Sequence, residues 1–215
     1  VDQMSRVFEE DWIFSGKKSF VPASFHASGP LPGTMPARII PDGPDADYDK
    51  VELMALGALS CAQKSVHIVT PYFLPENNIL TSLEIAAMRG VEVEIIIPSK
   101  SNIVGMDGAM RANFKRLLAK GVKIFRTQPP FDHSKIMVVD GAWLFVGSAN
   151  WDVRSFKLNF ECNMECMDKQ LAEEVLKIIA HKKAHAHSEK WDQHIRPPLL
   201  RKLADNALRL LTPYY

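Results

Sequence analysis

Short apolar runs rich in β-branched residues alternate along this chain with longer stretches in which apolar residues recur with helical spacing. The short runs predict buried strands, and the periodic stretches predict amphipathic helices. The predicted strands span residues 37–40, 65–70, 91–97, 122–126, 136–139, 143–146 and 158–166. The predicted helices span residues 1–14, 48–63, 76–89, 106–120, 169–187 and 198–211. Strands that alternate with helices indicate an α/β fold, built as an α/β/α sandwich.

The sheet of this sandwich is expected to be mixed but mostly parallel, because helices separate most of its strands. Asp140-Gly141 lies between two apolar runs, and this dipeptide is typical of a tight β-hairpin. A hairpin joins antiparallel strands, so the sheet cannot be wholly parallel. Residues 15–36 contain proline, glycine and serine and form the best candidate for a linker.

Composition narrows the possible functions only a little. In 215 residues, 47% hydrophobic content is enough for one well-packed domain. The net charge of +1 gives no bulk electrostatic attraction to nucleic acid, so no nucleic-acid partner is expected. No apolar run is long enough to predict a membrane-spanning helix. Cys61, Cys162 and Cys166 are expected to be reduced thiols in a cytosolic environment.

One stretch around the predicted hairpin carries polar residues in the pattern H-x-K-x4-D-x6-G-S-x-N. Its members are His133, Lys135, Asp140, Gly147, Ser148 and Asn150. Side chains two positions apart on a strand share a face, so His133 and Lys135 point the same way. The hairpin then returns Ser148 and Asn150 to the end where His133 lies. These side chains therefore converge on one place that suits a phosphodiester.

Each residue type in this set fits a task in phosphoryl transfer. An imidazole such as His133 can attack phosphorus, or can protonate a departing alkoxide. Lys135 supplies a fixed positive charge for the phosphoryl oxygens, and Ser148 and Asn150 can donate hydrogen bonds to them. Gly147 allows the backbone to approach closely. A carboxylate could hold the imidazole in one tautomer, and the candidates are Asp140 and Glu161.

This pattern resembles the HKD signature of the phospholipase D superfamily. The flanking segments resemble the bacterial cardiolipin synthase branch of that superfamily, in its C-terminal half. They are Thr70-Pro71-Tyr72-Phe73-Leu74-Pro75, Arg154-Ser155, Leu158-Asn159-Phe160-Glu161 and residues 191–213. The resemblance implies a phospholipase D-like fold and phosphatidyl transfer that makes cardiolipin from phosphatidylglycerol through a phosphohistidine. It also implies that Glu161 orients His133, that Asp140 holds the hairpin, and that the reaction needs no cofactor and no metal.

The family builds its site from two such motifs, whereas the complete pattern occurs once here. The resemblance therefore implies that residues 1–36 are the tail helix of a preceding half plus a linker, and that residues 37–215 are the catalytic domain. In that case His133 is the general acid, and the nucleophile comes from the missing half. Alternatively, two copies associate and His133 serves in both roles. The isolated monomer is expected to be nearly inert.

Two other functions remain open at this point. One is a homodimeric single-motif phosphodiesterase, nuclease or phospholipase D, and the other is an inactive membrane-docking fragment. The resemblance also implies phospholipid substrates and a peripheral position on the cytoplasmic side of a bacterial cell membrane. The notable amphipathic stretch is residues 198–211, whose leucine stripe is expected to pack on the parent domain or its missing half, or to lie in a membrane interface.

Weaker candidates lie elsewhere in the chain. Tyr72 and Phe73 follow a predicted strand and could line the entry for a lipid or glycerol group. Residues 100–102 follow the next strand, and they and Arg111 are weak candidates for phosphate contact. The histidines in residues 181–187 lack a completing glutamate, so this basic segment is expected to be a solvated helix face instead of a metal site.

Overall fold

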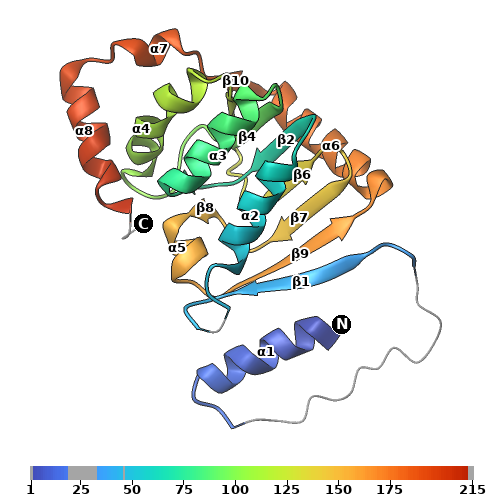
Figure 1. Ribbon diagram of the computed structural model, residues 1–215. Coiled ribbons are helices and arrows are strands. Elements are labelled where there is room, and N and C mark those ends of the chain that lie inside the picture. Colours follow the sequence, from blue (N-terminus) through green and yellow to red (C-terminus); the bar gives the residue numbers. More distant parts are fainter. Residues whose placement is uncertain (1, 19–32, 46, 213–215) are drawn as a thin grey trace.

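Eight strands form the central sheet in the order β1-β9-β7-β6-β2-β4-β5-β10. The structure is a computed structural model that describes residues 2–18, 33–45 and 47–212 (Figure 1). The strands of this sheet are β1 (Ala37–Asp42), β2 (Ser65–Val69), β4 (Glu92–Pro98), β5 (Lys123–Thr127), β6 (Ile136–Val139), β7 (Trp143–Gly147), β9 (Glu161–Met167) and β10 (Ala186–Ser188). Two short strands, β3 (Phe73–Leu74) and β8 (Trp151–Asp152), pair with each other outside this sheet.

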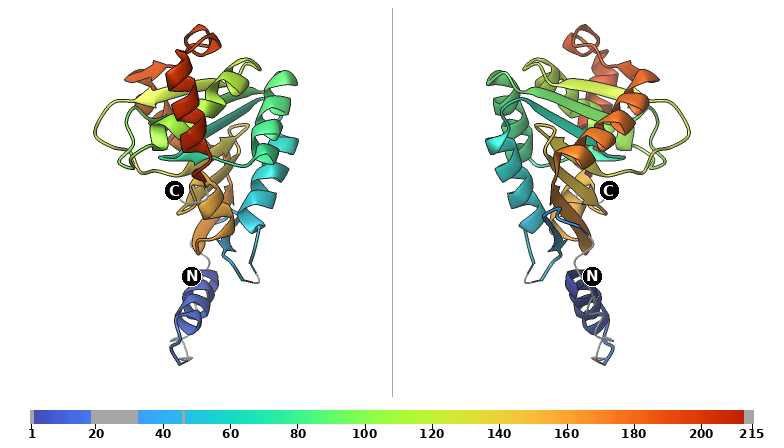
Figure 2. Two further views of the ribbon diagram at one scale, coloured as in Figure 1. Left: turned by 90° about the vertical axis from the view of Figure 1, so that its left-hand side faces the viewer. Right: turned by 90° about the vertical axis from the view of Figure 1, so that its right-hand side faces the viewer.

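Helices cover both faces of the sheet. The helices of the described residues are α1 (Asp2–Phe14), α2 (Lys50–Cys61), α3 (Asn77–Met88), α4 (Met106–Leu118), α5 (Val153–Lys157), α6 (Lys169–Ala184), α7 (Asp192–Ile195) and α8 (Leu199–Arg209). Helices α2, α3 and α4 lie on one face and α6 lies on the other (Figures 1 and 2). Helix α8 packs on the outside of α4. These layers confirm the predicted α/β/α sandwich.

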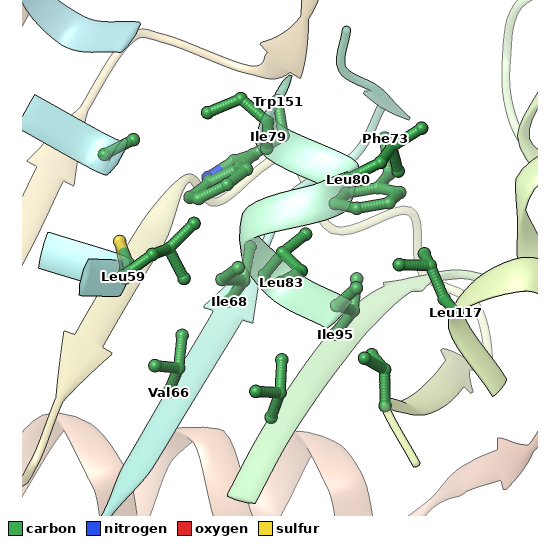
Figure 3. Close-up of a cluster of buried hydrophobic side chains, with 14 of the residues drawn as sticks. Leu59, Val66, Ile68, Phe73, Ile79, Leu80, Leu83, Ile95, Leu117 and Trp151 are labelled. Atoms are coloured by element: carbon green, nitrogen blue, oxygen red, sulfur yellow. The ribbon is translucent and has the colours of Figure 1, made fainter. Parts of the chain in front are cut away.

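The two cores explain why the apolar residues of β4 point to both of its faces. Its side chains alternate between the two faces, so Val93 and Ile95 enter the core under α2, α3 and α4, whereas Ile96 enters the smaller core under α6. In the larger core, Leu59 and Leu83 reach down from their helices onto the sheet (Figure 3). Burial on both faces fixes the register of the central strands, because a slip by one residue would exchange the two faces.

The sheet is mixed, as predicted, but the expectation that it is mostly parallel was wrong. Among the described strands, only the pairs β2–β4 and β4–β5 are parallel, and the other neighbours in the sheet are antiparallel. The cause is the run of antiparallel neighbours β6, β7, β9 and β1, which continues from the hairpin side of β2. The parallel strands β2, β4 and β5 all end at one edge of the sheet, and β6 begins at that same edge.

Several element boundaries differ from the prediction. The helix predicted for residues 169–187 ends at Ala184, and β10 follows as an edge strand paired with β5. The strand predicted to begin at residue 158 begins at Glu161, after the short helix α5. Most of the predicted linker, residues 19–32, lies outside the described residues. Within the described ranges, no helix combines the length and apolar character needed to cross a bilayer.

Candidate active site

The candidate site lies at the edge of the sheet where β2, β4 and β5 end. Because β6 is antiparallel to β2, the residues just before β6 reach the same edge as the residues just after β2. The hairpin pairs Ile136 with Val146, so Gly147 and the residues after it also return there. His133, Lys135, Tyr72 and Ser148 are thus brought to one edge by strand register alone.

His133 and Lys135 are in direct contact. Lys135 Nζ lies 3.0 Å from His133 Nδ1 and 3.4 Å from Nε2, and it donates a hydrogen bond of 2.9 Å to the backbone oxygen of His133. Only 9% of Lys135 is exposed. Burial lowers the pKa of Lys135, although the negative charges of Glu161, Asp152 and Asp132 oppose that shift. The predicted imidazole and ammonium therefore share one face at the site edge.

The pKa of His133 is lowered, first by burial and then by the positive charge of Lys135. Two aromatic rings, Tyr72 and Phe131, each lie 5.9 Å from the imidazole centroid, and Tyr72 meets it edge-on. The hydroxyl of Tyr72 donates a hydrogen bond of 2.7 Å to Asn102 Oδ1. This bond ties the loop after β2 to the loop after β4. The rings form an apolar wall beside one side of His133, so neutral imidazole is favoured there.

Phe73 does not reach this wall, and its predicted part in substrate binding was wrong. The side chain is fully buried and stacks on Trp151 at 6.4 Å between ring centroids. The cause is the pairing of β3 with β8, which turns Phe73 into the core while its neighbour Tyr72 faces the site. Adjacent positions on an extended segment face opposite sides, so the two rings cannot share one role.

Gly147 is required by the close approach of β7 and β9. A Cβ atom at residue 147 would lie 2.5 Å from Asn163 Cα and 2.6 Å from the backbone oxygen of Cys162. The absence of a side chain at Gly147 therefore allows β7 to lie against β9, and its expected part in substrate binding stays a prediction. Asn163 Oδ1 in turn accepts a hydrogen bond of 3.1 Å from Ala149 N. The turn that carries Ser148 and Asn150 is therefore held against β9.

Ser148 and Glu161 are hydrogen-bonded to each other. The hydroxyl of Ser148 donates to Glu161 Oε2, and Asn159 Nδ2 donates to Glu161 Oε1 at 3.3 Å. In the described part of the chain, the hydrogen bonds of the His133 ring are to Lys135, not to Glu161. The expected carboxylate–imidazole pair is not formed in this structure. The charge of Glu161 acts on the neighbouring Lys135.

Asn150 has an unusual environment for an amide. Its Oδ1 is buried and has no hydrogen-bond partner among the described atoms. A buried polar atom without a partner is costly, so such atoms are rare in folded proteins. The backbone of Asn150 is fixed by a hydrogen bond of 3.0 Å from its N to Ser155 Oγ. Its side chain is thus held near the motif with an unused acceptor.

Asp152 is a site residue that the sequence did not single out. Its Oδ1 accepts a hydrogen bond of 2.8 Å from Ser155 N and caps α5. Burial raises the pKa of Asp152 to about 6, and the negative charge of Glu161 adds to the rise. The charge of Asp152 also acts on Lys135. The available signal was its place two residues after the G-S-x-N turn and three residues before a serine.

Asp140 lies at the opposite end of β6, so its predicted place among the catalytic residues was wrong. Seven residues separate it from His133, which corresponds to about 20 Å of extended chain. Its carboxylate accepts hydrogen bonds from the backbone N of Gln63, Lys64 and Ser65 at 3.0, 2.7 and 2.9 Å. These amides hold the hairpin to the start of β2, which is the structural role that was expected for Asp140 as a hairpin residue.

The weaker candidates are not gathered at the site in the same way. Asn102 contacts Tyr72, but the backbone N of Ser101 donates to Asp107, which lies in the first turn of α4. Arg111 lies on α4, where it pairs with Asp205 of α8. In the described part of the chain, no group of three or more histidine, cysteine, aspartate or glutamate side chains could hold a metal ion.

The comparisons with known proteins agree with this architecture. The profile of the family described as "Cardiolipin synthase, PLD-like domain" matches residues 56–183. The chain is 31% identical to the cardiolipin synthase of Geobacillus kaustophilus over 99% of its own length and 43% of that protein. It is 34% identical to cardiolipin synthase 1 of Staphylococcus aureus over 86% of its length and 38% of that protein. The chain thus spans about two fifths of these curated relatives.

Solved structures share the fold at lower identity. The phosphatidylserine synthase of Haemophilus influenzae superposes with a TM-score of 0.66 and 17% identity, covering 97% of this chain and 51% of that protein. The phospholipase D family member Nuc of Salmonella typhimurium superposes with a TM-score of 0.62 and 19% identity, covering 73% of this chain and 99% of that protein. At this identity the likeness shows the fold alone.

Proposed function

This chain belongs to the family of phospholipase D-like domains found in cardiolipin synthases, and we propose that it supplies one half of a phosphatidyltransferase active site. The proposed reaction transfers a phosphatidyl group from phosphatidylglycerol to the glycerol hydroxyl of a second phospholipid and forms cardiolipin. The observation that carries the proposal is the contact of Lys135 with His133 at 3.0 Å, at an edge of the sheet where both side chains face the same way.

The roles of the residues follow from this contact. A histidine from the other half attacks phosphorus, a phosphohistidine forms, and the departing glycerol oxygen takes a proton from His133. In the second step His133 removes the proton from the acceptor hydroxyl, which attacks phosphorus and releases the first histidine. Lys135 balances the charge on the phosphoryl oxygens, and Asn150 donates a hydrogen bond to them. Ser148 donates a second one when its hydroxyl, which donates to Glu161 in this structure, turns to the substrate. Tyr72 bounds the site beside His133.

Glu161 acts through its neighbours in this proposal. It holds the Ser148 hydroxyl and lies close enough to affect Lys135 electrostatically. Residues 37–215 form the catalytic domain, and residues 1–36 are the tail of a preceding half plus a linker. The enzyme works at a phospholipid membrane, as a peripheral protein on the cytoplasmic side. A second histidine set from the missing half, or from a second copy of this chain, completes the site.

Complementation tests the proposal. Cardiolipin formation from phosphatidylglycerol vesicles would be measured for the chain alone and after addition of the first half of the Geobacillus kaustophilus relative. We expect turnover with both halves and a loss of about 10²- to 10⁴-fold in His133→Ala, the usual contribution of a general acid or base. Lys120→Met, in the turn after α4, is the matched control and should keep full activity. Folded halves that associate without making cardiolipin would contradict the proposal.

The same proteins distinguish the proposed half-enzyme from a homodimeric phosphodiesterase that uses a single motif. If the chain alone forms a dimer by light scattering and cleaves a phosphodiester such as DNA, and His133→Ala abolishes that cleavage, the homodimeric phosphodiesterase is correct instead. Binding to vesicles without turnover in any combination would favour the inactive docking fragment. The intact contact of His133 with Lys135 argues for an active site over a remnant.

A further inference from the structure

Helix α8 packs on the domain with its polar face. Asp205 is buried against α4, where its carboxylate accepts hydrogen bonds of 2.8 Å and 3.2 Å from the guanidinium of Arg111. Leu208 completes the contact by covering Gly108, whose missing side chain leaves room for it. Of the surfaces expected to cover the leucine stripe, the structure therefore rules out the parent domain and leaves its missing half and a membrane interface.

The leucine stripe therefore points away from the domain. A residue advances about 100° around a helix, so the stripe lies roughly half a turn from Asp205. Its members are 46% to 81% exposed: Leu199, Leu200, Leu203, Leu210 and Leu211. The left view of Figure 2 shows α8 lying on the outer surface of the molecule. A contiguous exposed stripe of this kind marks a surface that is covered in the working protein.

A cationic cavity adjoins the stripe between α4, α7 and α8. Its volume is about 370 Å³, and its lining includes five basic side chains and one carboxylate. The basic residues are Arg111, Lys115, Arg196, Arg201 and Lys202. The carboxylate, Asp205, is already paired with Arg111. In the described part of the chain the side chains of Arg196 and Lys202 have no ion pair, so the cavity carries uncompensated positive charge.

The stripe and the cavity belong to one surface. Leu199, the first residue of α8, lines the cavity and also begins the stripe. At the other end of the helix, Arg209 and Thr212 line a second cavity together with Val153. Val153 directly follows Asp152 in the sequence, so the second cavity includes the residue next to one whose charge acts on Lys135.

We propose that α8 docks the protein on an anionic lipid bilayer, with its leucine stripe in the interface and the adjoining cationic cavity holding a lipid phosphate. The proposal rests on the proposed function for the class of lipid and goes beyond it by assigning the docking surface. An amphipathic helix that carries leucine on one face and lysine or arginine on the other binds membranes in this manner. The basic residues add attraction to anionic lipids.

Charge decides between the bilayer and a second copy of the chain. In a twofold dimer the same patch faces itself, so a dimer through α8 would bring two sets of these cations together. An anionic bilayer offers instead an apolar layer for the leucines and a layer of phosphates for the cations. The leucine stripe and the cationic cavity then each contact a complementary layer of the same bilayer.

Vesicle flotation of the full chain tests this assignment. We expect binding to vesicles of phosphatidylcholine with phosphatidylglycerol and little binding to phosphatidylcholine alone. Leu200→Ser with Leu210→Ser should weaken binding about tenfold or more, because both side chains would lose burial in the interface. Arg196→Gln with Lys202→Gln should remove the preference for anionic lipid. Leu53→Ser with Ile85→Ser, at exposed sites on α2 and α3, is the matched control and should bind like the parent chain.

Additional controls distinguish loss of membrane docking from unfolding and from dimer formation. All four positions in the first two variants are solvent-exposed, and thermal unfolding would confirm that each variant is folded. Unchanged vesicle binding in the leucine variant overturns the proposal, as does release of the parent chain by millimolar inorganic phosphate. A dimer in solution that dissociates in the leucine variant, with vesicle binding intact, would also overturn it and assign α8 to a second copy. His133→Ala should bind normally, so failure of catalysis alone leaves this inference standing.

Discussion

The ammonium of Lys135 lies 3.0 Å from Nδ1 of His133, so two groups that both carry positive charge when protonated share one corner of the site. Burial and this neighbouring charge together lower the pKa of His133. An imidazole that is neutral near pH 7 can accept a proton, and a bound anionic phosphate would restore its tendency to hold one. The pair thus couples the protonation of His133 to the presence of substrate.

Replacing Lys135 should move the titration of His133 upward. In Lys135→Met the repulsive charge is removed while burial remains, so we expect the pKa of His133 to rise but to stay below its ordinary value. Histidine titration by NMR on the isolated chain measures this without any need for turnover. Lys120→Met should leave the His133 titration unchanged. An unaltered or lower pKa for His133 in Lys135→Met would show that the two groups are not in contact in solution.

Gly147→Ala should be strongly destabilising. The added methyl group would meet backbone atoms of Asn163 and Cys162 at 2.5 and 2.6 Å, and neither backbone can move without separating β7 from β9. We expect a loss of about 2–4 kcal/mol in the free energy of unfolding, measured by urea denaturation. Gly57→Ala is the matched control, because Gly57 lies on α2 with open space around it. That control should be stabilising by about 0.5–1 kcal/mol.

The site could be predicted where local pattern determines position. The H-x-K spacing, the Asp-Gly hairpin and the glycine before Ser148 each fix geometry through strand register and backbone sterics, so the contact of His133 with Lys135 followed from the sequence. Phe73 could not be placed, because its burial depends on pairing with Trp151, 78 residues later.

Tertiary contacts also explain the other features that the sequence did not predict correctly. The periodicity of α8 predicts an amphipathic helix, but only the ion pair between Asp205 and Arg111 determines which face meets the domain. Asp140 is part of the motif, yet its partners are amides at the start of β2, which no spacing rule identifies. Whether each strand pair is parallel or antiparallel likewise depends on which strands lie next to each other in the sheet.

Asp140 should contribute to stability and not to chemistry. Asp140 and Gly141 both have positive φ, at 53° and 61°, which suits a tight hairpin turn. Asp140→Ala loses three amide hydrogen bonds. It also puts alanine at a positive φ without the polar side chain that helps aspartate adopt this conformation. We therefore expect the free energy of unfolding to fall by about 2–3 kcal/mol. Asp140→Asn keeps one oxygen and tolerates this conformation, so it should cost about 1 kcal/mol. Both should leave the NMR titration of His133 unchanged, and a shift there would contradict the structural role.

Glu94 is buried in the centre of β4, where it accepts hydrogen bonds of 2.6 and 2.7 Å from Lys183 and contacts His67 Nδ1 at 3.0 Å. Burial alone would raise the pKa of Glu94, but the hydrogen bonds from His67 and Lys183 lower it to about 2. Because this pKa lies below the ordinary value of 4.5, the folded protein favours the carboxylate more than the unfolded chain does. The resulting stability is complete above about pH 4.5 and disappears as the pH falls toward about 2.

Glu94→Gln should therefore remove a pH-dependent part of the stability. At pH 6.5 we expect the variant to lose on the order of 3 kcal/mol relative to the parent chain, and at pH 3 the difference should be clearly smaller, because the parent chain has begun to lose the same contribution. Urea denaturation at both values measures the two differences. Glu92→Gln, on the same strand, is the matched control: its pair with Lys123 is exposed, so the change should stay within about 0.5 kcal/mol at either pH. A difference for Glu94→Gln that does not shrink on acidification would mean that packing, not charge, holds β4 to α6.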